Sequence, residues 1–474
     1  MQLLFEKSKS GMQGISLPQL DVPKQDGVIP DKFLRDDFEL PELNEVDIVR
    51  HYTALSKMGF GVDNGFYPLG SCTMKYNPKI NEVVANLPGF TQIHPYQPLV
   101  QGALELLYNL ESYFAEITGM HSVTFQPSAG AHGELTGLMI IKKYFEQKGE
   151  KRTKILTPDS SHGTNPATAT MCGYQTITIK SDKRGTVDID DLKRNLDNEV
   201  SALMITNPNT LGLFEEDILE ISKIMHEQGA LVYGDGANMN ALLGITKPGD
   251  LGIDVIHLNL HKTFSIPHGS GGPGACAVGV KEFLTKYLPN PRVIKDGEEF
   301  KLDYGNKDTI GRVRAFYGNF NNLVRAYTYI RSLGPDGLRD VAEHSILNAN
   351  YLKEKLRKHY RLVYDRVCMH EFVLDDSNIP NHLTTMDIAK RLIDYGFHPP
   401  TIYFPLIVHG AMMIEPTETE SKEMLDSFIF AMIKIKEETE SEPEVVRTSP
   451  HTTPVSRLDN VKAAREPDLR WKTK

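Results

Sequence analysis

The sequence has few cysteines and no paired-cysteine motif. Its cysteines lie far apart and show no CxxC spacing; they are Cys72, Cys172, Cys276 and Cys368. Structural zinc sites and disulfide frameworks need closely spaced or paired cysteines, so the spacing argues against both. We expect reduced thiols, and we expect only Cys72, in the loop 68–75, near a functional site.

Long hydrophobic runs and basic stretches are also lacking. The apolar runs are far shorter than a membrane span, and charged residues follow the first five residues at once, unlike in a secretion signal. The 52 Lys and Arg against 62 Asp and Glu give a net charge of -10, without a long basic stripe for nucleic-acid phosphates. These absences predict a cytoplasmic protein that binds neither membrane nor nucleic acid.

The length of 474 residues is too great for one ordinary core. Changes of pattern predict four segments. These are an N-terminal arm at 1–95, a large domain at 96–332, a small C-terminal domain at 333–440 and a C-terminal tail at 441–474. The arm is rich in Pro and Gly, and the basic tail contains the only tryptophan, Trp471. We expect both to lie on other surfaces.

Short apolar runs alternate with helical patterns in the large domain. The spacing predicts a helix from Gly102 that ends at the cap residue Gly119. Strands are expected at 123–125, 154–157, 175–179, 202–206, 230–234, 255–260 and 275–280. Such alternation predicts an α/β fold with a largely parallel sheet covered on both faces and with ligands at the carboxyl ends of the strands.

The small domain is expected to end in a long helix from near Glu418 to Lys436. Thr417 and Glu420 have the spacing of a capping box at its start.

Two charged residues follow buried-type strands. Lys262 comes directly after the apolar run 255–260 and before the glycine-rich 267–274, and Asp235 ends the apolar run 231–234. Pyridoxal phosphate needs a lysine for a Schiff base, a carboxylate at its ring nitrogen and backbone donors for its phosphate. The pattern therefore predicts this cofactor. An N-cap role for Asp235 is the alternative.

Other candidate residues lie at neighbouring strand ends. Ser128, Ala129 and Gly130 pass from a strand into a helix, where N–H groups can bind an anion, although Ser128 could be a simple helix cap. His162 could stack on the cofactor ring, and His261 could donate to the phosphate.

Two competing motifs carry less weight. A metal site at His257, His261 and His268 lacks an acid to complete a familiar ligand set, so we expect no metal. The run 269–274 matches GxGxxG, but a strand-like segment and not a helix follows it, which argues against dinucleotide binding. A phosphate-lining role across a subunit interface stays open for this loop.

Five motifs closely resemble the lysine-bearing half of the glycine cleavage system P protein, and the similarity spans nearly the whole chain. They are 68–75, 161–167, 233–241, 258–274 and 413–418. The resemblance implies the aspartate aminotransferase type of fold, fold type I, in which a large domain with a mostly parallel sheet is joined to a small C-terminal α/β domain.

The resemblance also implies a reaction and its residues. Glycine is decarboxylated on pyridoxal phosphate, CO2 is released and the aminomethyl group passes to the lipoyl arm of the H protein, which is an oxidoreductase activity. Lys262 carries the Schiff base, Asp235 protonates the ring nitrogen and His162 stacks on the ring. The remaining cofactor contacts implied are Ser128, Ala129, Gly130, Asn207, Ala237 and His261.

The single-chain form of the family carries a second, lysine-free copy of the fold upstream, and this sequence does not contain it. The resemblance therefore implies a separate subunit 1 and an α2β2 heterotetramer. Two alternatives stay open. One is another fold type I enzyme, such as an aminotransferase or desulfurase, that would share Lys262 and Asp235. The other is a non-catalytic scaffold subunit.

Overall fold

The computed structural model describes residues 2–25, 27–36, 40–269 and 274–470. The chain divides into two units, the N-terminal unit Met1–Gly65 and the main unit Phe66–Lys474. Within the described residues, no helix is both long enough and apolar enough to cross a membrane.

The N-terminal unit is built from short helices and extended chain. It contains α1 (Leu4–Lys7), η1 (Asp31–Phe33) and α2 (Glu45–Ser56). Asn44 begins α2, because its side chain accepts a hydrogen bond from the Asp47 N–H. Many large apolar side chains between these helices are exposed: Ile15, Leu17, Leu20, Val22, Val28, Ile29, Phe33, Leu34 and Leu40. The described part of this unit therefore has little core of its own.

A seven-stranded sheet forms the centre of the main unit. Its strands are β1 (Ser122–Thr124), β2 (Lys154–Pro158), β3 (Gln175–Ile179), β4 (Val200–Thr206), β5 (Leu231–Asp235), β6 (Val255–Asn259) and β7 (Cys276–Val280). Their order is β1-β7-β6-β5-β4-β2-β3, and only β7 runs antiparallel to its neighbours. Each predicted strand overlaps an observed one, so the largely parallel sheet is confirmed.

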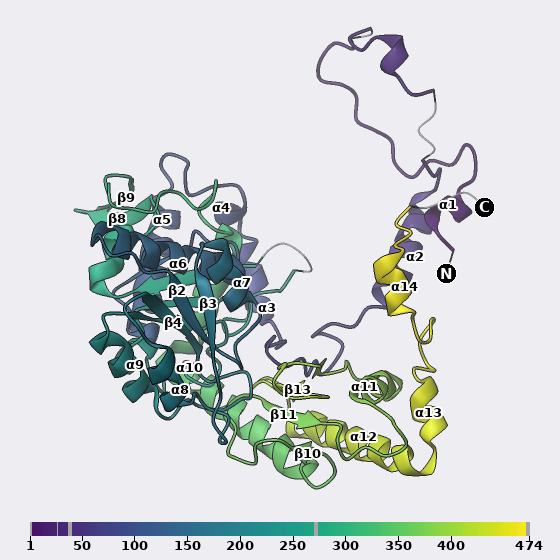
Figure 1. Cartoon of the computed structure of the whole chain (residues 1–474). Coiled ribbons are helices and arrows are strands. Elements are labelled where there is room, and N and C mark those ends of the chain that lie inside the picture. The colour runs from purple at the N-terminus through teal and green to yellow at the C-terminus, as the bar shows by residue number, and fades with distance from the viewer. Residues whose placement is uncertain (1, 26, 37–39, 270–273, 471–474) are drawn as a thin grey trace. The chain divides into compact units, whose positions relative to one another are not determined.

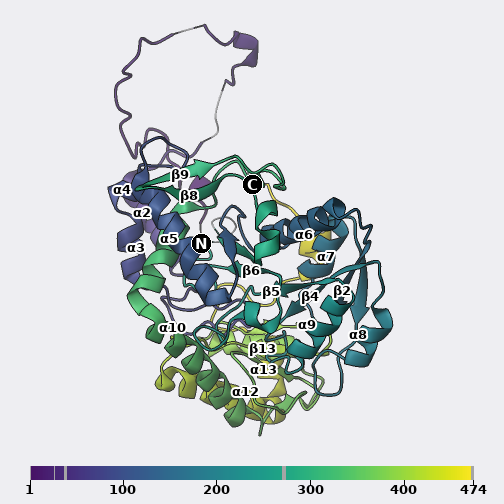
Figure 2. The same cartoon turned by 90° about the vertical axis from the view of Figure 1, so that its left-hand side faces the viewer.

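Helices cover both faces of this sheet (Figures 1 and 2). Two helices, α6 (Gly130–Gln147) and α7 (Thr164–Met171), pack on one face. The other face carries α5 (Gln101–Thr118), α8 (Ile189–Asn195), α9 (Ile218–Glu227) and α10 (Phe320–Leu356). Helix α5 ends at Gly119, whose φ of 68° closes the helix as predicted.

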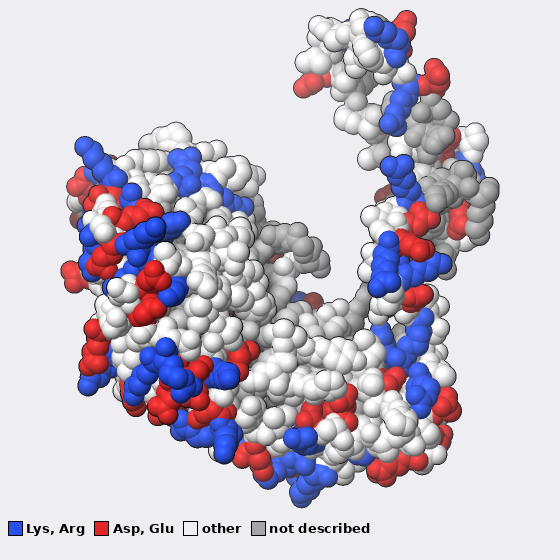
Figure 3. Space-filling model, viewed as in Figure 1, with Lys and Arg blue, Asp and Glu red and all other residues white. Residues whose placement is uncertain are grey.

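Smaller elements complete this part of the main unit. They are α3 (Lys79–Ala85), α4 (Pro88–Thr91), η2 (Pro248–Leu251), η3 (Glu282–Tyr287), β8 (Arg292–Asp296) and β9 (Glu299–Asp303). Helix α3 packs along α10, where Arg325 Nε lies 2.7 Å from Glu82 Oε1. Residues 66–95 therefore belong to the main unit. On the face seen in Figure 3, the described charged side chains of this unit are of both signs and interspersed.

A second, antiparallel sheet lies in the C-terminal part. It joins β10 (Arg361–Leu362), β11 (Phe372–Asp375), β13 (Met412–Ile414) and β12 (Thr401–Ile402) in that order. Its helices are α11 (Thr385–Asp394), α12 (Lys422–Ser441), α13 (Pro443–Thr448) and α14 (Asn460–Arg465). Helix α10 reaches from the large sheet into this part, and Gly334 interrupts its helical geometry.

The predicted start of α12 is wrong. Its N-cap is Ser421, whose Oγ accepts a hydrogen bond from the Met424 N–H at 3.2 Å. Thr417 cannot cap the helix because it lies outside it, in a left-handed conformation with a φ of 60°. Glu418 is turned inward instead, where its carboxylate lies 2.7 Å from the buried Lys75 Nζ.

The first part of the C-terminal tail contacts the main unit, to which it belongs. Arg457 lies 2.8 Å from Asp387, and the His451 N–H donates to Asp394. Trp471 lies outside the described residues.

Candidate active site

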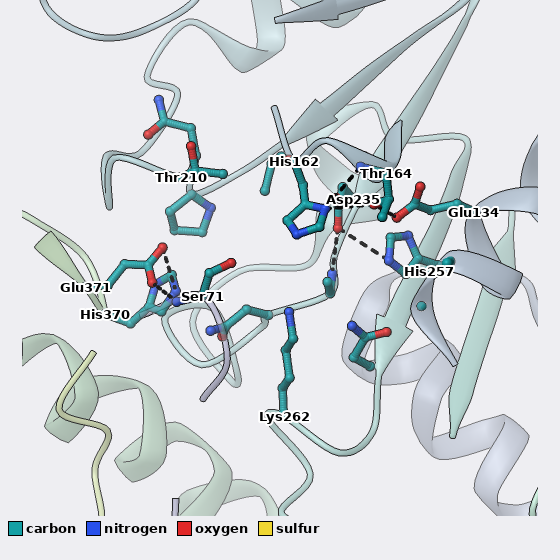
Figure 4. Close-up of a pocket in the computed structure, with 18 residues that line it drawn as sticks. Ser71, Glu134, His162, Thr164, Thr210, Asp235, His257, Lys262, His370 and Glu371 are labelled. Atoms are coloured by element: carbon teal, nitrogen blue, oxygen red, sulfur yellow. Dashed lines mark hydrogen bonds and ion pairs between the residues drawn. The ribbon is translucent and has the colours of Figure 1, made fainter. Parts of the chain in front are cut away.

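A cavity opens at the carboxyl ends of β4, β5 and β6 (Figure 4). This is the edge of a parallel sheet where α/β folds bind ligands. Five of the predicted site residues line it: Gly130, His162, Asp235, Ala237 and Lys262. Four others do not line it: Ser128, Ala129, Asn207 and His261.

Lys262 points into the cavity from the turn after β6 (Figure 4). Its N–H donates to the carbonyl of Asn259 at 3.0 Å, and its own carbonyl accepts from the Ser265 N–H at 3.1 Å. The next residue anchors the turn, because Thr263 Oγ1 accepts from the Met239 N–H at 2.8 Å. The half-buried lysine is therefore held by backbone on both sides.

Asp235 is the buried last residue of β5. Its Oδ1 accepts the Ala237 N–H at 3.0 Å and lies 3.4 Å from His257 Nε2. Burial alone would raise the pKa of Asp235, but His257, the Ala237 N–H and the charge of Lys262 outweigh it and lower the pKa. The carboxylate therefore stays ionised. The N-cap alternative is wrong, because the next helical element after Asp235 is η2, which begins at Pro248.

His257 connects Asp235 to a buried tyrosine. The Tyr233 hydroxyl lies 2.8 Å from His257 Nδ1. Burial raises the pKa of Tyr233 well above its usual value, so the hydroxyl stays protonated and can donate a hydrogen bond to His257 Nδ1. Burial also lowers the pKa of His257, so the ring is neutral, and we assign its one proton to Nε2 because that atom lies 3.4 Å from the Asp235 carboxylate. Sequence reasoning considered His257 only as a metal ligand.

The side chain of Thr164 contacts both Glu134 and His162. Thr164 Oγ1 lies 2.7 Å from Glu134 Oε1 and 2.8 Å from His162 Nδ1, and Thr168 Oγ1 lies 3.1 Å from Glu134 Oε2. Burial, and then the charge of Asp235, raise the pKa of Glu134 to about 7. The contacts fix the orientation of the His162 ring at the cavity. Sequence reasoning missed Glu134, which lies on the same helix as Gly130.

Helix α6 begins within the predicted phosphate-binding segment, residues 128–130. Ala129 is the N-cap and no side chain caps the helix, so the alternative that Ser128 caps it is wrong. The Ser128 N–H instead donates to His132 Nδ1 at 3.1 Å. A Cβ on Gly130 would lie 2.4 Å from Asn259 Oδ1, so only glycine fits between the helix and β6.

His261 and Asn207 are near the cavity without lining it. His261 Nδ1 is buried without a partner beside Gly274, close to Ala129. Asn207 holds its own loop, because its Oδ1 accepts the Glu215 N–H at 3.0 Å. Residues 270–273 of the glycine-rich loop lie outside the described residues.

The described histidines 257, 261 and 268 do not form one metal-ligand group. His257 instead lies beside two acids: possible ligand atoms of Glu134, Asp235 and His257 lie within 4.8 Å of one another. A second such group is His370, Glu371 and Glu415.

The opposite wall of the cavity comes from distant parts of the chain. Ser71, His370 and Glu371 lie there, and Glu371 Oε2 accepts the Ser71 N–H at 2.7 Å. Ser71 and Glu371 are 300 positions apart in the sequence. No spacing pattern could have brought them together.

Several polar atoms around the cavity are buried without a protein partner. In the described part of the chain they include Thr206 Oγ1, Asn259 Oδ1, His257 Nε2 and His370 Nδ1. His257 Nε2 lies within ion-pair range of Asp235, but it makes no well-aligned hydrogen bond. Unpaired buried groups call for a polar ligand. With the uncapped start of α6, they fit a phosphate-bearing pyridine aldehyde that Lys262 and Asp235 can hold.

Known proteins share both the sequence and the fold. Residues 19–301 match the family described as Glycine cleavage system P-protein, and residues 341–453 match Glycine dehydrogenase, C-terminal domain. A probable glycine dehydrogenase (decarboxylating) subunit 2 of Bacillus licheniformis is 59% identical over 476 residues, covering 99% of this chain and 98% of that protein. The chain belongs to the glycine cleavage system P-protein family.

A second P-protein relative, from Caldanaerobacter subterraneus subsp. tengcongensis, bears the same description. It is 58% identical over 477 residues, covering 99% of this chain and 98% of that protein. The resemblance expected from the five motifs is thus confirmed.

Solved structures confirm the fold class of this P-protein chain. The crystal structure of glycine decarboxylase (P-protein) of the glycine cleavage system, in inhibitor-bound form, has a TM-score of 0.71 at 22% identity and covers 86% of this chain and 93% of that one. A cysteine desulfurase from Thermococcus onnurineus has a TM-score of 0.62 at 17% identity, covering 79% and 97%. The architecture is that of fold type I.

Proposed function

We propose that this chain is the lysine-bearing subunit of a glycine decarboxylase. It releases CO2 from glycine and passes the remaining aminomethyl group to the lipoyl arm of the H protein. Membership of the P-protein family supports glycine as the substrate and pyridoxal phosphate as the cofactor. The observation that carries the proposal is that Lys262 and Asp235 face one cavity beside the uncapped start of α6.

Pyridoxal phosphate, when bound, supplies a protonated pyridine ring that accepts the electron pair left by the loss of CO2. Lys262 would hold the cofactor through a bond between its Nζ and the carbonyl carbon. Asp235 would hold the proton of the ring nitrogen, and neutral His257 lies beside that carboxylate, with its Nε2 3.4 Å from Asp235 Oδ1. His162 would stack on the ring.

The other cofactor contacts that we propose are those implied by the family resemblance. The N–H groups of Ser128, Ala129 and Gly130 would bind the phosphate at the start of α6, with His261 as a further donor. Asn207 would lie near the ring hydroxyl, and Ala237 would pack against the ring.

The assembly we propose is an α2β2 heterotetramer with a lysine-free subunit 1, and it also binds lipoylated H protein. Relatives described as subunit 2 support a partner subunit. The exposed apolar side chains at 15–40 support a docking role for the N-terminal unit, because apolar surface of this kind marks contacts with other proteins.

Exchange of labelled bicarbonate into glycine tests this function. We expect negligible exchange by this chain alone, measurable exchange with subunit 1, and much faster exchange once lipoylated H protein is added. Lys262→Ala should abolish it, and borohydride should leave a phosphopyridoxyl label on Lys262 only. Full exchange by the isolated chain, or sulfur release from cysteine in place of glycine turnover, would point to a self-contained fold type I enzyme such as a desulfurase.

A further inference from the structure

A pair of buried carboxyl groups has no part in the function proposed above. Glu371 and Glu415 are 3% and 0% exposed, and one oxygen of each lies within 4.8 Å of the other. In the view of Figure 4, Glu371 and His370 lie on one side of Lys262, and Asp235 and His257 lie on the other. The cavity thus has a second acidic wall, away from the carboxylate that we assign to the ring nitrogen.

No guanidinium or ammonium group neutralises this pair at contact distance among the described residues. The charged and titratable groups that face it are His370, Cys72 and Lys262. Burial, together with Lys262, lowers the pKa of His370 to about 3, so that ring is neutral although its Nε2 lies 3.8 Å from Glu371 Oε1. Two carboxylates this close, out of water, cannot both be ionised. The pair therefore holds a proton.

The hydrogen bonds decide which carboxyl carries that proton. Glu415 accepts from the Thr73 N–H at 2.9 Å, from Thr73 Oγ1 at 2.7 Å and from Asn238 Nδ2 at 2.8 Å. Glu371 accepts one bond, from the Ser71 N–H. Burial raises the pKa of Glu415 too, but donors favour the charged form of a carboxyl group, so Glu415, which has more of them, is the anion and Glu371 is the acid. Burial, and then the charge of Glu415, raise the pKa of Glu371 well above its usual value.

The loop that supplies these donors is held in an unusual conformation. Ser71 and Thr73 have φ of 64° and 52°, a left-handed region that side chains other than glycine rarely adopt. Both turn their N–H groups to the carboxyl pair. Of the two carboxyls, only Glu371 lines the cavity. The wall is therefore built to present one neutral acid to the substrate.

We propose that Glu371 is a catalytic acid that protonates the sulfur released when the lipoyl disulfide accepts the aminomethyl carbon. Glu415 is a positioning residue that keeps the proton on Glu371. This inference rests on the function proposed above, because that function supplies the disulfide.

The step balances as follows. Loss of CO2 leaves an electron pair on the substrate carbon, and this pair forms a bond to one sulfur as the sulfur–sulfur bond breaks. The second sulfur leaves with the electrons of that bond, so the disulfide is reduced by two electrons and the carbon is oxidised. Glu371 gives its proton to the leaving sulfur. The ammonium group of the next glycine, which must lose a proton before its nitrogen can react, returns one to Glu371.

An acid is needed because an alkyl thiolate leaves slowly at neutral pH, its thiol having a pKa above 8. A positioned acid contributes about 10²- to 10⁴-fold to such a step. Cys72, the residue after Ser71 in the same loop, is a poor donor, because burial raises the pKa of its thiol to about 11.

Infrared spectroscopy of the full chain tests the protonation state without any turnover. At pH 8 the wild type should show a protonated carboxyl band that disappears in Glu371→Gln, and Glu415→Gln should shift its titration to lower pH. Glu215→Gln is the matched control. It removes another buried glutamate, whose pKa is raised to about 7, and should leave the band at pH 8 in place. A pH 8 spectrum that does not change in Glu371→Gln would overturn the proposal.

Single-turnover kinetics with subunit 1 and lipoylated H protein test the role. Glu371→Gln should keep the absorbance change on adding glycine but form free lipoyl thiol about 10²- to 10⁴-fold more slowly, and Glu371→Asp should recover part of that rate. Thiol formation within about threefold of the wild type would refute the role of Glu371. Absence of thiol formation in the wild type itself would refute the proposed function, whatever the infrared spectrum shows.

Discussion

At the scale of single residues, the role that we propose for Asp235 is to keep the ring nitrogen of the cofactor protonated, so that the ring can take up electrons. We expect Asp235→Asn to keep the cofactor and to lower glycine decarboxylation by about 10²-fold or more, because each unit of pKa lost at the ring nitrogen costs about 1.4 kcal/mol. The measurements are cofactor absorbance and bicarbonate exchange. Asp254→Asn is the matched control. Asp254 is equally buried and bonds His226 and the Val232 N–H just before β6, so its loss should lower stability and not turnover.

Glu134 makes stability depend on pH. Its pKa in the folded chain is about 7, above the unfolded value of 4.5, so the folded state holds a proton that the unfolded state has lost between these two pH values. Stability therefore falls as pH rises from 4.5 to 7. Glu134→Gln removes this loss and should stabilise the cofactor-free chain by about 1–3 kcal/mol more at pH 8 than at pH 5.

The melting temperatures of wild type and Glu134→Gln across this pH range provide the check. In an Asp235→Asn background the pH-dependent gain should shrink, because part of the shift comes from the charge of Asp235. A melting-temperature difference that is the same at pH 5 and pH 8 would contradict the assignment.

At the scale of elements, the fit of α6 on the sheet holds the site together. Three glycines of this helix, Gly130, Gly133 and Gly137, face β6, β7 and β5 at distances that leave no room for a side chain. A Cβ on Gly137 would lie 2.4 Å from the ring of Tyr233, whose hydroxyl orients His257. The close packing of this helix and the proton arrangement at Asp235 are therefore linked through one tyrosine.

Gly137→Ala should destabilise the chain by about 1–3 kcal/mol, although alanine is normally the better helix former. Thermal unfolding measures this, and bicarbonate exchange should fall as well. Gly102→Ala in α5 is the control, because no atom lies within 4 Å of its Cβ position, so its stability should be unchanged or slightly higher. Equal effects at the two sites would mean that α6 does not need the close approach.

At the scale of the whole molecule, the N-terminal unit has more exposed apolar surface than it can bury by itself. We expect Leu17→Asp with Leu20→Asp to weaken association with subunit 1 by at least about tenfold, because these side chains are 86% and 69% exposed and would be buried at the contact. Sedimentation of mixtures measures this. The cofactor should still bind, since the cavity residues all lie in the main unit.

Leu347→Asp, on α10, changes a side chain with 62% exposure and should leave association unchanged. If the double variant assembles as the wild type does, the docking role of the N-terminal unit fails.

The division into domains also belongs to this scale. We propose that the large domain ends near residue 332 and the small domain begins at 333, close to the point where Gly334 breaks α10. The C-terminal antiparallel sheet then has its own core.

The sequence by itself determined the sheet, its strands and the lysine–aspartate pair. The spacing of apolar residues and the apolar runs are local properties of the sequence. In a parallel sheet, ligands bind at the carboxyl ends of the strands, so Lys262 and Asp235 could be placed near the cavity from the sequence alone. Only the tertiary structure decided the second wall. Ser71, Glu371 and Glu415 meet through the packing of a loop against the small sheet, and no local pattern records which distant segments will touch.

The same distinction explains the wrong start of α12 and the missed role of His257. The spacing of Thr417 and Glu420 allowed a cap, but the buried Lys75, far away in sequence, draws Glu418 inward and moves the helix start to Ser421. In the sequence, His257 was considered only as a candidate metal ligand. Burial keeps the His257 ring neutral, and the register of the neighbouring strand places the Tyr233 hydroxyl 2.8 Å from its Nδ1.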